Sequence, residues 1–158
     1  MKIILASDHA GYTMKNELST YLTQLGYEIT DIGTHSEESA NYAIYGRMAA
    51  DKVATGEADR AILVCGTGIG MALAANTVKG VRCVNCNEPY TALLSRQHNN
   101  ANALAIGARI IGREMAKTIV KTWLSTEFEG NRHAQRVDML TAMKEKPEPG
   151  AYVAEEIS

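Results

Sequence analysis

Residues 61–70 read Ala-Ile-Leu-Val-Cys-Gly-Thr-Gly-Ile-Gly, and this stretch decides the fold class. Its first half is continuously apolar, as is typical of a strand that is buried on both faces of a parallel sheet. Its second half places three glycines directly before a helical pattern. Such glycines let backbone N–H groups surround an anion, and the helix N-terminus adds positive potential. The stretch therefore predicts a strand, an anion-binding loop and a helix, with an ordinary tight turn as the alternative to the binding loop.

Apolar runs of strand length recur on both sides of this stretch, and helical patterns separate them. The runs cover residues 2–7, 27–32, 81–85 and 103–107. Apolar residues repeat at helical spacing near residues 14–25, 40–55, 69–78, 88–98 and 113–125. The first of these helices is expected to bury Met14, Leu18, Tyr21, Leu22 and Leu25, and the last Met115, Ile119, Val120 and Trp123.

This alternation predicts a doubly wound, Rossmann-like α/β fold. We expect a five-stranded parallel sheet with helices on both faces and ligands beyond the carboxyl ends of its strands. An extra C-terminal helix is predicted from Asn131, its expected cap, to about Lys144, where Lys-Pro-Glu-Pro-Gly stops it. Residues 1–146 are expected to form one domain, since a chain of this length supports a single core, and residues 147–158 a tail.

Composition excludes several classes of protein. Hydrophobic residues make up 46% and charged residues 22% of the 158, which is typical of a globular chain. A net charge of -2 argues against a broad nucleic-acid or membrane-binding surface. No apolar stretch approaches the roughly 18 residues of a membrane helix, and the N-terminus is unlike a signal peptide. We expect a cytoplasmic protein with its three cysteines as thiols.

Side chains capable of acid–base chemistry follow two of the predicted strands. Asp8 and His9 end the first strand, although Asp8 is also placed to cap the next helix and His9 to be a partly exposed loop residue. Cys65 precedes the glycine loop, where the field of the helix N-terminus would favour a thiolate able to act as a base or nucleophile. A small buried cysteine is the alternative.

Other candidates lie later in the chain. Cys83 and Cys86 have the C-x-x-C form, but no second pair completes a zinc site, and a strand before them places Cys83 in the core. His98 ends a helix, and Arg109 follows the fifth strand. Arg132 and Arg136 have i, i+4 spacing beside His133 and could clamp a phosphate, although a solvated basic face is the common explanation of such a pair.

Taken together, these motifs resemble the type B ribose-5-phosphate isomerases and the wider family that includes galactose-6-phosphate and allose-6-phosphate isomerases. The resemblance covers roughly residues 3–145, and the ordered set of motifs is specific although each motif alone is weak. The matching residues are Ser7-Asp8-His9-Ala10-Gly11, Cys65-Gly66-Thr67-Gly68-Ile69-Gly70, Ala74-Ala75-Asn76, Glu88-Pro89-Tyr90, Ser95-Arg96-Gln97-His98-Asn99 and Gly130-Asn131-Arg132-His133-Ala134-Gln135-Arg136.

The resemblance implies interconversion of an aldose phosphate and its ketose through a cis-enediolate, without a metal or an organic cofactor. Cys65 would then be the base that moves a proton between C1 and C2, and Thr67 would assist transfer between the two oxygens. His98, helped by Asp8, would open the furanose ring.

The resemblance also implies a binding role for further residues. The developing oxyanion would be held, with Asn99 nearby, by backbone N–H groups of Gly66, Thr67, Gly68, Ile69 and Gly70. The phosphate would be bound by His9, Arg109, Arg132, Arg136 and His133. In the family the site lies between two subunits, so a homodimer is implied, with a tetramer as an alternative.

One segment departs from the family. Where many type B enzymes have Asp-Tyr-Pro, this chain has Asn41-Tyr42-Ala43-Ile44, which keeps Tyr42 in the expected pocket wall. The substrate could therefore be a tetrulose 4-phosphate, allose 6-phosphate or galactose 6-phosphate in place of ribose 5-phosphate. Two further classes stay open: a phosphometabolite-binding module without catalysis, and a thiol redox role for Cys83 and Cys86.

Overall fold

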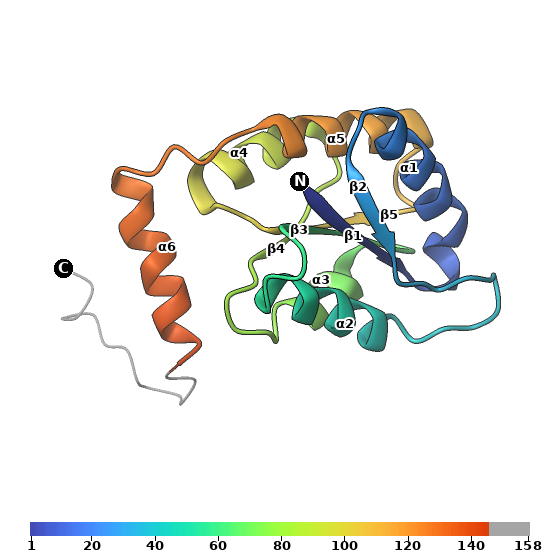
Figure 1. The fold of residues 1–158 in the computed structure, drawn as a ribbon, viewed down its shortest axis with the longest axis horizontal. Coiled ribbons are helices and arrows are strands. Elements are labelled where there is room, and N and C mark those ends of the chain that lie inside the picture. The colour runs from blue at the N-terminus through green and yellow to red at the C-terminus, as the bar shows by residue number, and fades with distance from the viewer. Residues whose placement is uncertain (146–158) are drawn as a thin grey trace.

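The computed structural model describes residues 1–145, and it has the predicted doubly wound α/β fold (Figure 1). All five strands are parallel, in the order β2-β1-β3-β5-β4. The strands are β1 (Lys2–Ser7), β2 (Glu28–Asp31), β3 (Arg60–Cys65), β4 (Cys83–Asn85) and β5 (Ala103–Gly107). The helices are α1 (Tyr12–Gln24), α2 (Tyr42–Ala54), α3 (Ile69–Ala75), α4 (Pro89–Asn99), α5 (Arg113–Ser125) and α6 (Arg132–Met143), and a 3-10 turn covers His9–Gly11.

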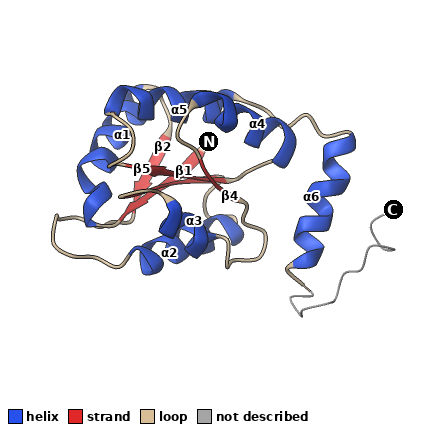
Figure 2. Cartoon of the chain, turned by 180° about the vertical axis from the view of Figure 1, so that it is seen from behind, coloured by secondary structure: helices blue, strands red, loops and turns tan. Residues whose placement is uncertain are grey.

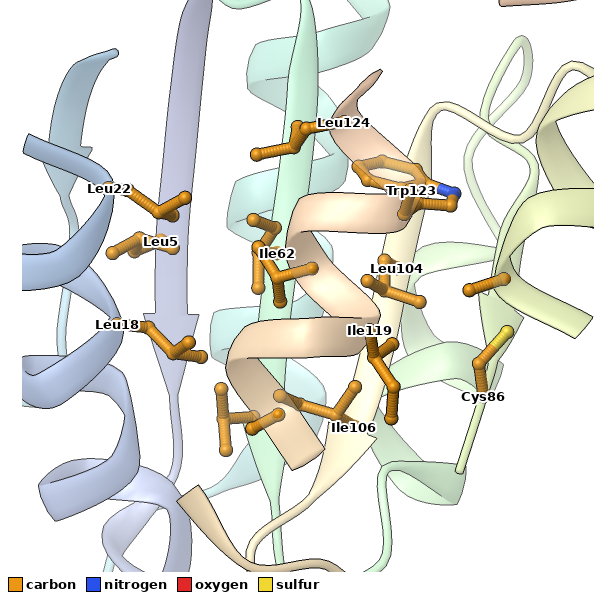
Figure 3. Packing of buried hydrophobic residues seen from close by; sticks show 14 of the residues in the cluster. Leu5, Leu18, Leu22, Ile62, Cys86, Leu104, Ile106, Ile119, Trp123 and Leu124 are labelled. Atoms are coloured by element: carbon orange, nitrogen blue, oxygen red, sulfur yellow. The ribbon is translucent and has the colours of Figure 1, made fainter. Parts of the chain in front are cut away.

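Helices cover both faces of the sheet, as the apolar strands require. Figure 2 shows α1, α5 and α4 on one side and α2 and α3 on the other. Side chains alternate between the two layers along β3: Ile62 and Val64 pack beneath α1 and α5, whereas Leu63 and Cys65 pack toward α2 and α3. Figure 3 shows the first of these clusters, in which Trp123 of α5 lies among aliphatic side chains. The central strands are therefore buried on both faces, as predicted.

Two of the predicted strands differ from those observed. β2 is half exposed because it is an edge strand with β1 as its neighbour, so the expectation that this run is buried on both faces was wrong. β4 begins at Cys83 and not at residue 81. The backbone bonds explain this difference: the N–H of Val81 donates to Val78 in a turn, and the N–H of Arg82 donates to the Asn102 side chain, so pairing with β5 begins only at Cys83. Helix α3 also ends earlier than predicted, at Ala75, where the Asn76 side chain bonds both the N–H and the carbonyl of Cys83.

Two side chains expected in the core lie outside it. Leu25 follows the last turn of α1 and is 45% exposed, and Met115 in the first turn of α5 is 43% exposed. Both residues lie at helix ends, where the side chain extends past the sheet and does not pack against it. The central apolar positions of the two helices, including Leu18, Leu22 and Trp123, are buried as predicted.

The last helix, α6, stands apart from the main body and packs on α4 (Figure 1). Asn131 precedes it, as predicted, but the side chain does not cap the helix: its amide donates to the carbonyl of Glu129. At the other end of α6, the Lys144 ammonium donates to the carbonyls of Val78 and Val81. The predicted tail, residues 147–158, lies outside the described residues. Within residues 1–145, no helix has the length and apolarity needed to span a bilayer.

Candidate active site

The first group of candidate residues meets at the carboxyl edge of the sheet. Ser7 of β1 is in register with Val64 of β3, so the next pair is Asp8 and Cys65. Ala6 and Leu63, two residues earlier, pack toward α2 and α3, and the alternation of strand side chains directs Asp8 and Cys65 to that same side. The Asp8 carboxylate also accepts the N–H of Gly11 at 3.1 Å, so it caps the 3-10 turn as the alternative interpretation expected.

Cys65 is buried, and its sulfur is a hydrogen-bond acceptor. Sγ accepts the backbone N–H of Gly68 at 3.1 Å. Helix α3 has seven residues and is shorter than predicted, so the immediate partner of the sulfur is this loop amide and not the end of a long helix. Gly68 has φ +82° and touches the backbone of Ile106, a conformation and a proximity that favour glycine.

Asn85 holds the glycine loop in place, and sequence analysis did not single it out. Its side-chain amide donates to the carbonyls of Thr67 at 3.2 Å and Ala105 at 3.1 Å. Thr67 Oγ1 in turn accepts the N–H of Ile69 at 3.2 Å. A polar residue at the carboxyl end of a predicted strand was the signal that pointed to Asn85, because ligand-binding residues gather there.

Two side chains lie directly against the loop, and His9 follows β1 at the same edge of the sheet. The Arg109 guanidinium lies against Gly66, where an added Cβ would be 3.2 Å from Nη1, and the Tyr42 ring lies against Gly70, where an added Cβ would be 2.7 Å from the ring. His9 Nδ1 lies 3.1 Å from the backbone nitrogen and 3.3 Å from the carbonyl oxygen of Ala40, so this backbone segment positions the imidazole ring. This edge of the sheet therefore offers a thiol, a carboxylate, an imidazole and a guanidinium around a loop of backbone amides.

The segment that departs from the family has a defined structural role. Asn41 caps α2, since its Oδ1 accepts the N–H of Ala43 at 2.9 Å. Aspartate and asparagine cap helices about equally well, so the cap survives the change of Asp to Asn. The position of Tyr42 against the loop agrees with the predicted pocket wall.

The second group lies where α4 meets α6. His98 and Asn99 end α4, and the His98 ring stacks on His133 with centroids 4.3 Å apart and planes 13° apart. Burial lowers the pKa of His133, and the charges of His98 and Arg132 lower it further. Arg132 and Arg136 are exposed, and the Arg136 guanidinium donates to the Arg132 carbonyl at 3.0 Å.

Sequence analysis also missed Glu129 in the second group. Its carboxylate is 3.8 Å from His133 Nε2, and its N–H donates to the carbonyl of Gln97 at 3.1 Å. Glu129 precedes α6, so the pairing rule for helix surfaces gave no signal for this contact.

A single chain does not unite the two groups. Helix α4 begins just after the carboxyl end of β4 and returns toward the start of β5. Its 11 residues extend about 16 Å, which carries His98 away from the edge that holds Cys65. Asp8 and His98, which were expected to act together, therefore belong to different ends of one molecule.

Cys83 and Cys86 lie apart from both groups. Cys83 packs in the cluster beneath α2 and α3, and Cys86 in the cluster on the other face of the sheet. Burial raises the pKa of Cys83 to about 12 and also raises that of Cys86. Two buried thiols on opposite faces favour a packing role over the redox alternative.

Known proteins resemble this chain over nearly its whole length. The profile of the family described as Ribose/Galactose Isomerase matches residues 3–140. Ribose-5-phosphate isomerase B of Escherichia coli (strain K12) is 48% identical over 92% of this chain and 97% of its own length. D-erythrulose-4-phosphate isomerase of Pectobacterium atrosepticum is 39% identical, with coverage of 89% and 93%. The solved structure of ribose-5-phosphate isomerase B from Clostridium thermocellum has a TM-score of 0.92 and 47% identity, with coverage of 94% and 100%.

Proposed function

Because the chain belongs to the ribose/galactose isomerase family, and is a sugar-phosphate isomerase, we propose that it interconverts ribose 5-phosphate and ribulose 5-phosphate with Cys65 as the base. The observation that carries the proposal is the Cys65 sulfur, which accepts a loop N–H beside Asp8 and Arg109. The ribose-5-phosphate isomerase B enzymes of Escherichia coli and Clostridium thermocellum, at 48% and 47% identity, also support the choice of sugar.

The reaction begins with ring opening. His98, assisted by Asp8, moves the proton of the anomeric hydroxyl to the ring oxygen, which breaks the C1–ring-oxygen bond and leaves an aldehyde. The Cys65 thiolate then removes the proton on C2, and the electron pair forms a cis-enediolate. Cys65 returns this proton to C1 while Thr67 assists proton transfer between O1 and O2. No atom or electron is gained or lost, so the chemistry needs no redox partner.

The loop amides supply the stabilisation that a thiolate base requires. A proton next to a carbonyl is weakly acidic, and loss of one oxyanion donor typically costs about 2.7 to 4 kcal/mol in the transition state. Gly66 to Gly70 form the loop that carries such donors next to Cys65. The hydrogen bonds from Asn85 hold this loop in one shape, so the donors need not reorganise during the reaction.

The phosphate would be held by cationic side chains from both groups. Arg109 and His9 lie at the Cys65 edge, and Arg132, Arg136 and His133 at the end of α4 and the start of α6. Binding energy at the phosphate would fix C1 and C2 against Cys65, with Asn99 and Tyr42 bordering the sugar.

The separation of the two groups supports a homodimer with composite sites. In such a dimer, His98 and the late arginines of one chain would complete the Cys65 edge of the other. Exposed apolar side chains border the Cys65 edge and offer a surface for this contact: Ile44, Met48, Ile69 and Leu73 are 44% to 68% exposed. A tetramer would need a second subunit interface in addition to this one.

Complementation tests the composite site. Cys65→Ala and His98→Asn should each, alone, turn over substrate at least about 100-fold more slowly than wild type. If the two variants are unfolded together in equal amounts and refolded, half of the dimers should be mixed, and each mixed dimer should hold one intact site. We expect about a quarter of the wild-type rate. A rate that stays at the level of the separate variants would place both residues in the same chain's site.

A substrate panel tests the identity of the sugar. The ratio kcat/KM should be largest for ribose 5-phosphate and at least about 10-fold lower for erythrulose 4-phosphate, allose 6-phosphate and galactose 6-phosphate, since one carbon unit in a fitted pocket is worth roughly 10- to 200-fold. The assay is run in chelator. A higher kcat/KM for another sugar phosphate would change the assigned substrate but not the isomerisation mechanism. Binding of the sugar phosphates without turnover of any of them would favour the non-catalytic binding module.

A further inference from the structure

Three potential metal ligands gather where α4 meets the start of α6. One nitrogen of His98, one nitrogen of His133 and one carboxylate oxygen of Glu129 all lie within 4.8 Å of one another. They come from three segments: His98 from the last turn of α4, Glu129 from the linker before α6, and His133 from the first turn of α6. The bond from the Glu129 N–H to the Gln97 carbonyl fixes the linker against α4, so this grouping is held by backbone structure.

The chemistry of these three groups matches a particular class of cation. Two imidazoles and one carboxylate, with a water in the fourth position, are the ligand set of open zinc sites. Imidazole ligands suit Zn²⁺, Ni²⁺, Cu²⁺ and Co²⁺, whereas Mg²⁺ and Ca²⁺ prefer sites made of oxygen atoms. The set therefore selects a transition-metal dication over the abundant hard cations.

Side-chain movement is needed to complete the geometry. Tetrahedral ligands with bonds of about 2.1 Å lie about 3.4 Å apart, so atoms that are up to 4.8 Å apart must approach by up to about 1.4 Å. The His98 and His133 rings are stacked with planes 13° apart, so one of the two rings must also rotate before both nitrogens face the same ion. The Glu129 side chain is 48% exposed and free to rotate, and the His133 ring is 12% exposed, so both can reach a solvent-borne ion. Arg132 and Arg136 oppose a cation, but both side chains are exposed and can turn toward solvent, while Glu129 supplies a negative charge.

We propose that His98, Glu129 and His133 form a binding site for a transition-metal dication of the Zn²⁺ class. An ion held there occupies the two imidazoles that the sugar phosphate would use. Zinc is then a reversible inhibitor that competes with substrate. The binding site is independent of the proposed function, and only the inhibition rests on it.

The test measures binding directly on the full chain in a Cys65→Ser background, which removes the buried thiol of the other group as a ligand. Titration with Zn²⁺ against a chromophoric chelator should give one site per chain, and Co²⁺ should give the visible absorption of a four- or five-coordinate ion without a sulfur charge-transfer band. Glu129→Gln and His133→Gln should each weaken Zn²⁺ binding at least about 10-fold. Mg²⁺ in excess should not displace the metal.

Glu114→Gln is the matched control, because Glu114 is an exposed carboxylate on α5 that is paired with Lys117. It should bind Zn²⁺ like the parent. Equal affinity in the parent and both ligand variants, or a sulfur charge-transfer band that persists without Cys65, would overturn the site. Tight zinc binding without competition against ribose 5-phosphate would keep the site and reject only the inhibition.

Discussion

Replacing Cys65 by alanine is expected to lower kcat by roughly 10²- to 10⁴-fold, the usual contribution of a positioned general base. The change removes one sulfur atom from a buried position and leaves the backbone amides of the loop and the surrounding cations in place. Affinity for the sugar phosphate, measured by calorimetry, should therefore change by no more than a few-fold. Loss of kcat with retained affinity is the signature of a group that acts on the reacting atoms.

Cys86→Ala is the control for this experiment, since it removes an equally small buried sulfur on the other face of the sheet. Its kcat should stay within a few-fold of wild type. Turnover by Cys65→Ala at the rate of this control would reject Cys65 as the base and would redirect attention to Asp8, the neighbouring acidic group at the same edge.

The fold could be predicted because its signals are local and mutually consistent. Continuous apolar runs marked β1, β3 and β5, and the helical periods between them required a parallel sheet. The expectation that the 27–32 run is buried on both faces overlooked Glu28, Thr30 and Asp31, whose polar side chains suit the edge position of β2. The error at Met115 has another cause, because its burial depends on neighbours that the sequence does not reveal: it has the correct helical spacing yet is exposed at the helix end. Helix α3 ends just before Asn76, whose side chain bonds the backbone of Cys83 in the next strand, a contact that helical spacing alone does not predict.

The candidate site could be predicted only in part, for a related reason. Cys65, Asp8 and Arg109 follow strands, and strand ends converge in any doubly wound sheet. His98 and His133 are brought together by the packing of α4 on α6, which no short-range pattern encodes. Asn85 and Glu129 each contact two other segments of the chain, so their roles became visible only in three dimensions.

Replacing Trp123 by alanine is expected to lower the free energy of unfolding by about 3 to 5 kcal/mol, the usual loss for a large buried aromatic residue. The indole is fully buried in the core beneath α5 (Figure 3). Two guanidinium groups also lie over it, with the Cζ atoms of Arg60 and Arg96 at 5.3 and 6.0 Å from the ring, so the change removes two cation–π contacts as well. Urea unfolding at fixed protein concentration measures the loss, because a dimer's apparent stability depends on concentration.

Trp123→Ala should also affect the second group of site residues, where α4 meets α6, because Trp123 lies close to the linker that leads to α6. Arg60 donates to the carbonyls of Trp123 and Leu124 at the end of α5, and Arg96 donates to Thr126 in the linker that leads to α6. Loss of the indole ring removes the cation–π contacts of both guanidinium groups. It also weakens the packing of α4 against the linker to α6, which holds the His98 ring on His133. We therefore expect KM for the sugar phosphate to rise in Trp123→Ala even under conditions where the protein stays folded.

Trp123→Phe removes part of the buried volume and keeps an aromatic ring. Among the residues that the structure describes, the indole Nε1 has no hydrogen-bond partner, so phenylalanine removes volume without breaking a bond and keeps an aromatic face for Arg60 and Arg96. Its loss should be clearly smaller, at about 1.5 kcal/mol. Equal losses of unfolding free energy for the two variants would mean that an aromatic ring beneath Arg60 and Arg96 does not stabilise the fold. A loss below about 1 kcal/mol for Trp123→Ala would contradict the central place of Trp123 in this core.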